Sequence, residues 1–177
     1  MNNSKQERED IINEKNTAQQ QLKDFLETFN KQSDIFNINE LLYGDVDLSI
    51  IQEEGFQLVK KIYFHPGKIT SISNVPKGIL LLECDNNILL SINNLPGSLE
   101  SLSLSNNLLE TVAIDNLSKL KILNVEHNNL TELENLPSNI EELNCEFNRI
   151  GSLVLTNLHK LKSLKVSNNI LTVIDGM

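Results

Sequence analysis

The feature that most constrains this chain is a spacing of apolar residues that recurs six times in phase. In the copy that begins at Ile79, apolar side chains occupy positions one, four, six, eleven and fourteen, and Asn87 occupies position nine. Internal repetition at this period is typical of a solenoid, because a single unit cannot bury its apolar face and stacked units share one continuous core. The copies begin at Val59, Ile79, Leu99, Leu120, Ile140 and Leu161, in steps of 20, 20, 21, 20 and 21 residues.

Positions four and six of each copy lie two residues apart, which is the alternation of a short strand that points both side chains into a core. The asparagine at position nine follows this strand. Its amide can bond backbone groups that stacking would otherwise leave buried and unpaired. The copy that begins at Val59 has Gly67 there instead. We predict a ladder of structural asparagines formed by Asn87, Asn107, Asn128, Asn148 and Asn169.

This pattern resembles the leucine-rich repeat, and the resemblance covers Val59 to Met177, about two-thirds of the chain. It implies an α/β solenoid in which each repeat adds a short parallel strand to a concave face. Repeats of 20 or 21 residues resemble the bacterial-type and internalin-like repeats, and similar proteins occur in large DNA viruses. Prolines near the ends of the shorter repeats favour an extended or 3₁₀ convex side without full helices. They are Pro76, Pro96 and Pro137.

Residues 1–58 do not fit the repeat, and we interpret them as a helical N-terminal segment and cap for the solenoid at 59–177. A stripe of apolar residues predicts a helix of about 25–30 residues in this segment. Its later half, from Leu22 to Phe29, is expected to cover the first repeat. Whether the first twenty residues instead form a coiled coil with a partner helix stays open. The stripe consists of Ile11, Ala18, Leu22, Phe25 and Phe29.

Two shorter stretches of the same segment, 37–44 and 48–61, are expected to form two further helices of the cap. Gly44 and Gly55 punctuate them.

Net charge and sequence composition exclude several classes of protein. The net charge is −9, of which 5 − 12 = −7 falls on residues 1–58 and 10 − 12 = −2 on residues 59–177. A nucleic-acid partner is not expected, because neither part offers a basic face. No apolar run is long enough for a membrane span, and the first residues lack the apolar stretch of a signal peptide. The expected location is the cytoplasm, or a particle assembled inside a cell.

The two cysteines, Cys84 and Cys145, both occupy position six. They are three repeats apart, which at ~4.8 Å per strand separates them by roughly 14 Å. A disulfide requires Cα atoms within about 7 Å. Both are therefore expected to be buried free thiols that pack as small hydrophobic side chains.

No motif in the chain predicts chemistry. There is no phosphate-binding loop, no nucleophile elbow and no paired cysteine and histidine. His65 and His127 lie three repeats apart, too far to share a metal, and no spacing resembles a zinc or EF-hand site. We therefore expect no enzyme activity, no catalytic residues, no cofactor and no bound metal.

The resemblance implies that a partner protein binds on the concave face, at the outward positions of the strands and at position eight after them. A serine patch in the middle is bordered by carboxylates and by three apolar side chains, which favours a basic or amphipathic protein segment as the partner. Ordinary solvation of these polar side chains is the competing interpretation. The candidate binding residues are Tyr63, His65, Leu81, Glu83, Asp85, Ser101, Ser103, Ser105, Ile122, Asn124, Glu126, His127, Glu142, Asn144, Glu146 and Phe147.

The sequence ends inside its sixth repeat, without a polar capping segment. Either the natural chain is longer or another subunit covers this end, because stacked apolar side chains and an open strand edge favour association. The alternative function is therefore a structural component of a larger assembly, such as a viral particle. It would be incorporated through its N-terminal helix and its uncapped C-terminal end, with self-association as one form of assembly.

Overall fold

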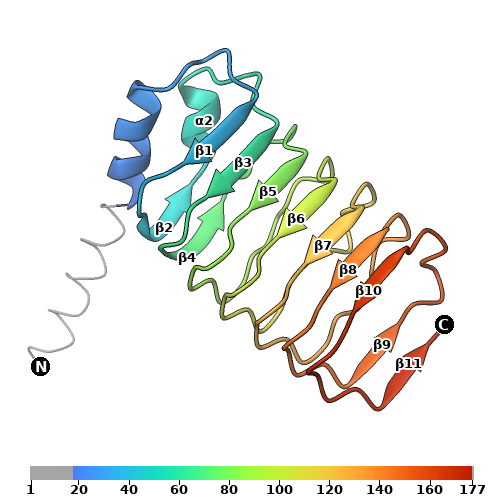
Figure 1. Cartoon of the computed structure of the whole chain (residues 1–177). Coiled ribbons are helices and arrows are strands. Elements are labelled where there is room, and N and C mark those ends of the chain that lie inside the picture. The colour runs from blue at the N-terminus through green and yellow to red at the C-terminus, as the bar shows by residue number, and fades with distance from the viewer. Residues whose placement is uncertain (1–17, 177) are drawn as a thin grey trace, which may run out of the picture.

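The computed structural model describes residues 18–176 and shows a solenoid whose turns follow one another along one axis (Figure 1). Seven parallel strands lie side by side in the order β1-β3-β5-β6-β7-β8-β10. The strands are β1 (Ile35–Ile38), β3 (Lys61–Phe64), β5 (Leu81–Glu83), β6 (Ser101–Ser103), β7 (Ile122–Asn124), β8 (Glu142–Asn144) and β10 (Ser163–Lys165).

The register of this sheet confirms that the six copies stack in phase. Leu82 pairs with Leu102, Leu102 with Leu123, and Leu123 with Leu143. These leucines of position four are buried, and the side chains of position six lie beside them in the same core. Burying one such leucine contributes about 1.5–3 kcal/mol, so the stacked column is a main source of stability.

The opposite side of the solenoid is extended, as expected. Strands β2 (Tyr43–Asp47) and β4 (Lys68–Ser73) pair at the N-terminal end, and β9 (Ser152–Val154) and β11 (Val173–Asp175) pair at the other. Within residues 59–176 the chain forms no helix. The asparagine two residues before each proline of the shorter repeats has a left-handed φ of 51–55°, which asparagine tolerates better than most residues. These are Asn74, Asn94 and Asn135.

The N-terminal cap is built around phenylalanine. Residues 18–27 are helical, and Ala18, Leu22 and Leu26 point into the core at a helical spacing of four. The ring of Phe29 meets that of Phe36 edge to face at 4.6 Å between centroids. The expectation that the helix covers the first turns is therefore confirmed for its later half. Ile11 and the possible coiled coil of the first residues lie outside the described residues.

The expected helix at residues 37–44 is wrong. This stretch contains the end of β1 and the start of β2, and β1 pairs with β3 so that Phe36 lies opposite Ile62. The concave sheet thus begins one strand before the first repeat that the sequence reveals. Strand pairing prevails here because the buried residues alternate with a period of two, from Phe36 to Ile38.

In the second stretch, 48–61, only α2 (Ser49–Glu53) is helical. The chain leaves this helix through Gly55, whose φ of 82° is left-handed and favours glycine.

One side chain of the cap also hydrogen-bonds to the outer edge of strand β2. Gln19 donates from Nε2 to the Asp47 carbonyl at 3.0 Å and accepts the Asp47 N–H at 2.9 Å. The outer edge of β2 is therefore partly occupied by an amide side chain, which removes part of an aggregation-prone edge.

Candidate protein-binding face

Asparagines at position nine hold the repeats together after each strand. Asn128 accepts the Leu109 N–H at 2.9 Å and donates to the carbonyls of Leu104 at 2.9 Å and Val125 at 3.1 Å. Leu104 and Leu109 belong to the preceding repeat, so one amide ties two turns through groups that are buried from water. The same arrangement recurs at Asn107, Asn148 and Asn169, and Asn87 accepts the Ile69 N–H in the first rung.

Gly67 replaces asparagine in the first repeat because the preceding turn leaves no room. A Cβ atom at Gly67 would lie 2.9 Å from the Leu42 carbonyl oxygen and 3.2 Å from Asn87 Oδ1. The Leu42 carbonyl also accepts the Lys68 N–H at 3.0 Å. The same backbone bond recurs in the later repeats, as from the Leu108 N–H to the Leu89 carbonyl at 2.9 Å, so the first repeat keeps this bond and lacks only the asparagine side chain.

The cysteines lie where the sequence predicts, inside the core and unpaired. Burial raises the pKa of the Cys145 thiol to about 12, and the nearby Glu146 charge adds to the effect. Burial raises the pKa of Cys84 as well. Both thiols are therefore protonated at neutral pH and serve as packing groups.

The concave face presents two rows of aligned side chains. Register pairs Tyr63 with Glu83, and the row of position five continues through Ser103, Asn124 and Asn144. The row also extends one strand further than the sequence indicates. Asn37 of β1 lies opposite Tyr63, and its Oδ1 is 3.1 Å from His65 Nε2. The second row, at position three, consists of Lys61, Leu81, Ser101, Ile122, Glu142 and Ser163.

The serine patch is organised by a single carboxylate. Asp85 Oδ1 accepts the Ser103 hydroxyl at 2.8 Å and the Ser105 N–H at 2.8 Å. Asn124 donates to the Ser103 hydroxyl at 3.2 Å. Ser105 is buried, so its side chain is not offered to a partner, whereas Ser101 and Ser103 remain partly accessible.

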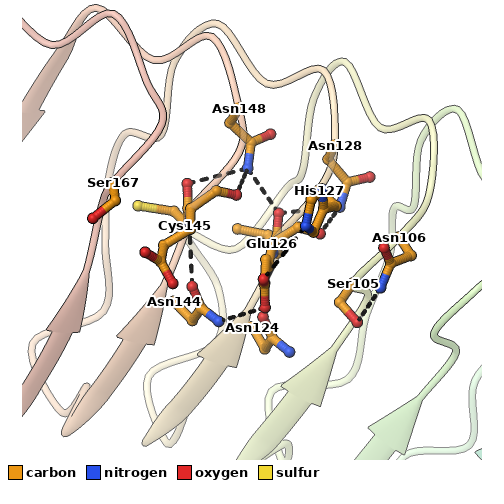
Figure 2. A network of polar contacts seen from close by, with 12 residues as sticks. Ser105, Asn106, Asn124, Glu126, His127, Asn128, Asn144, Cys145, Asn148 and Ser167 are labelled. Atoms are coloured by element: carbon orange, nitrogen blue, oxygen red, sulfur yellow. Dashed lines mark hydrogen bonds and ion pairs between the residues drawn. The ribbon is translucent and has the colours of Figure 1, made fainter.

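A second polar network crosses the next two strands. Asn144 donates to Glu126 Oε2 at 2.9 Å, and the N–H groups of Glu126 and Glu146 donate to Asn124 and Asn144, each at 3.2 Å. Figure 2 shows Glu126 and Asn144 reaching toward each other from neighbouring strands. These bonds fix the two asparagines and the Glu126 carboxylate, so this part of the face is preorganised.

The electrostatics of the face are dominated by carboxylates. Glu83, Asp85, Glu126, Glu142 and Glu146 occupy positions three, five and seven, and Lys61 and Lys165 flank them at the two ends. Burial raises the pKa of the Glu83 carboxyl, the Asp85 charge raises it further, and His65 opposes them. Among residues 18–176, no three acidic, histidine or cysteine side chains cluster as metal ligands would. None of the helices described here has the length and apolarity to cross a membrane.

The polar rows therefore bring together most of the predicted binding residues. Ile122 is exposed within the row of position three, and Phe147 and His127 are exposed at position eight. The sequence did not reveal that position eight is left-handed in five repeats. Only its three asparagines gave a signal for that backbone conformation. The five left-handed residues at position eight are Asn86, Asn106, His127, Phe147 and Asn168.

Comparison with solved structures finds leucine-rich-repeat proteins of bacteria. YopM, a leucine-rich effector protein from Yersinia pestis, matches 66% of this chain with a TM-score of 0.64 and 32% identity. YopM from Yersinia enterocolitica matches 67% of the chain at 19% identity and a TM-score of 0.49. A leucine-rich-repeat protein of Leptospira interrogans matches 66% at 19% identity and a TM-score of 0.46.

The chain spans 34% of the length of the first of these proteins, 40% of the second and 45% of the third. No protein-family model matches it, and no curated protein does. The in-phase strands, the asparagine ladder and the likeness to the Yersinia pestis effector agree with one another. This chain is a leucine-rich-repeat protein with short repeats of the bacterial type.

Proposed function

We propose that this chain is a non-enzymatic interaction scaffold that binds a basic or amphipathic segment of another protein on its concave face. The observation that carries the proposal is the charge of that face. Five carboxylates line its middle, and its lysines lie toward the ends of the sheet. A segment with positive charges along its length would complement this distribution.

Preorganisation supports the same proposal. The hydrogen bonds around Asp85 and Glu126 hold these carboxylates on a rigid sheet, so a partner would bind with little loss of side-chain entropy in the scaffold. Exposed apolar side chains next to them, Ile122 and Phe147, would contact the apolar part of an amphipathic segment.

The test uses twelve-residue peptides of matched hydropathy with net charges of +4, 0 and −4, titrated calorimetrically into the full chain. We expect only the basic peptide to bind, with an affinity that falls as salt rises. The double variant Glu126→Lys with Glu146→Lys should weaken binding of the basic peptide about tenfold or more. Glu132→Lys with Glu134→Lys changes the net charge equally on the exposed convex side and is the matched control. Equal losses from both pairs, or no preference for the basic peptide, would refute the proposal.

A second candidate function, incorporation into a larger assembly, is favoured by apolar side chains near β10 and β11. Ile170 is 67% exposed and Val173 is 56% exposed. Light scattering after size-exclusion chromatography tests it on the chain and on Ile170→Lys with Val173→Lys. A concentration-dependent oligomer that the double variant abolishes would support assembly through this surface. A monomer of about 20 kDa in both cases would contradict self-assembly.

A further inference from the structure

In two neighbouring repeats, position eight carries a residue other than asparagine. Asn86, Asn106 and Asn168 hold left-handed φ values of 53–58° there, and asparagine is among the residues that tolerate this conformation. His127 and Phe147 adopt the same conformation, with φ of 52° and 53°. For a bulky phenylalanine this is a strained backbone, and such strain is often found where a side chain serves recognition.

Burial does not explain the two exceptions. The rings of His127 and Phe147 are stacked in parallel, 4.0 Å apart between centroids and 8° from coplanar. Phe147 is nevertheless 41% exposed, and the His127 side chain is 45% exposed. By contrast, Phe36 of the cap is fully buried. The stack therefore presents aromatic surface to solvent at the end of the concave strands.

The Glu126 carboxylate borders this stack. Glu126 Oε1 lies 3.6 Å from His127 Nε2, and its other oxygen accepts a hydrogen bond from Asn144 (Figure 2). Glu146 precedes Phe147 and occupies the same position in the next repeat. Among residues 18–176 its carboxylate has no hydrogen-bond or ion-pair partner. An exposed aromatic surface thus lies beside the Glu126 carboxylate, and the unpartnered Glu146 carboxylate belongs to the residue next to Phe147 in the chain.

We propose that the His127–Phe147 stack, together with Glu126 and Glu146, is a seat for an arginine side chain of the partner protein. The inference rests on the proposed function, since it names the residue that the acidic concave face would recognise. A guanidinium is planar, stacks on aromatic rings and bonds carboxylates through two parallel N–H groups. A lysine ammonium offers charge without the flat surface and would fit less well.

The test measures binding of three eight-residue peptides to the full, ¹⁵N-labelled chain by NMR. The peptides share one sequence and carry two arginines, two lysines or two citrullines, which are flat but neutral. We expect the arginine peptide to shift the amide signals of His127 and Phe147 and to bind at least about fivefold more tightly than the lysine peptide. The citrulline peptide should not bind measurably, because it lacks charge.

The key variant is Phe147→Asn, which restores the residue used at this position in other repeats. We expect it to abolish the preference for arginine over lysine. It should leave the melting temperature unchanged or raise it by about 2–4 °C, because it relieves the left-handed strain. A fall of more than about 4 °C would assign Phe147 to holding the fold and overturn the inference.

The remaining outcomes separate this inference from the proposed function. Equal binding of the arginine and lysine peptides, unchanged by Phe147→Asn, would refute the arginine seat while leaving an acidic face that binds basic segments. No shift on the concave face with either charged peptide would refute both.

Discussion

Removal of one asparagine from the ladder should destabilise the chain by an amount that depends on how deeply that rung is buried. In Asn128→Ala the fully buried Leu109 N–H loses its acceptor, whereas the Leu104 carbonyl keeps the hydrogen bond that Asn107 donates at 3.1 Å. A buried polar group left unpaired costs about 1–3 kcal/mol, so the orphaned Leu109 N–H sets the expected loss at about 1–3 kcal/mol. A domain of this size has a stability of only about 5–15 kcal/mol.

The same substitution at Asn169 should cost less. Asn169 makes equivalent bonds, to the Ile150 N–H at 3.0 Å and the Cys145 carbonyl at 2.8 Å, but it is half-buried near the C-terminal end. The Cys145 carbonyl keeps a hydrogen bond from Asn148, and water can reach the Ile150 N–H through the opening that Asn169→Ala leaves, so the loss should be about 0.5–1.5 kcal/mol. Asn157→Ala is the control, because Asn157 is exposed and its loss should be within about 0.5 kcal/mol.

Urea unfolding followed by circular dichroism gives the three free energies of unfolding, and hydrogen exchange at the Leu109 amide reports the local effect. We expect faster exchange at Leu109 in Asn128→Ala and no change there in Asn157→Ala. Equal losses at Asn128 and Asn169, or a loss below about 1 kcal/mol at Asn128, would refute the reasoning that burial of the asparagine itself sets the cost.

Three further predictions follow from burial and close contact. Cys84 and Cys145 should resist iodoacetamide at pH 8 in the folded chain and react in urea. The reason is that burial raises the pKa of the Cys145 thiol to about 12 and raises that of the Cys84 thiol as well. Rapid labelling of the native protein would contradict this prediction. Glu83→Gln should raise the melting temperature at pH 7 but not at pH 3.5. Burial and a neighbouring aspartate raise the folded-state pKa of this carboxyl above its ordinary 4.5, so the native state loses stability relative to the variant as pH rises; an equal shift at both pH values would exclude this cause. Gly67→Ala should lower the free energy of unfolding in urea by about 1–3 kcal/mol, since its Cβ would meet a carbonyl oxygen at 2.9 Å. Gly151→Ala is the control, because a Cβ there meets nothing within 4 Å. Similar losses at both glycines would show that the contact is not the cause.

The sequence predicts the part of the fold that repeats. Six copies in phase place the repeated core leucines and every ladder asparagine, because stacking imposes the same environment on the same position in each turn. The turn that begins with β1 was missed for the same reason. It lies against the cap, Phe36 replaces the repeated leucine, and Leu41 stands where the asparagine would follow, so the repeated pattern is lost there.

The candidate site was predictable in its rows but not in its details. The alternation of a strand identifies the outward residues without coordinates. It cannot show that Asp85 draws the Ser105 backbone inward, since that bond joins residues twenty positions apart. It also cannot show that Phe147 is left-handed, because nothing in the local propensity of phenylalanine favours that conformation.

The close approach at Gly67 gives the solenoid a direction. Each asparagine reaches back to the repeat before it, so a repeat needs a predecessor with free backbone groups at the right places. At Gly67 the predecessor is the cap, and its Leu42 carbonyl already occupies the space that a side chain would need. A designer who wished to change the length of this protein should therefore add or remove whole repeats after Gly67, where each unit is interchangeable, and leave the turn before it intact.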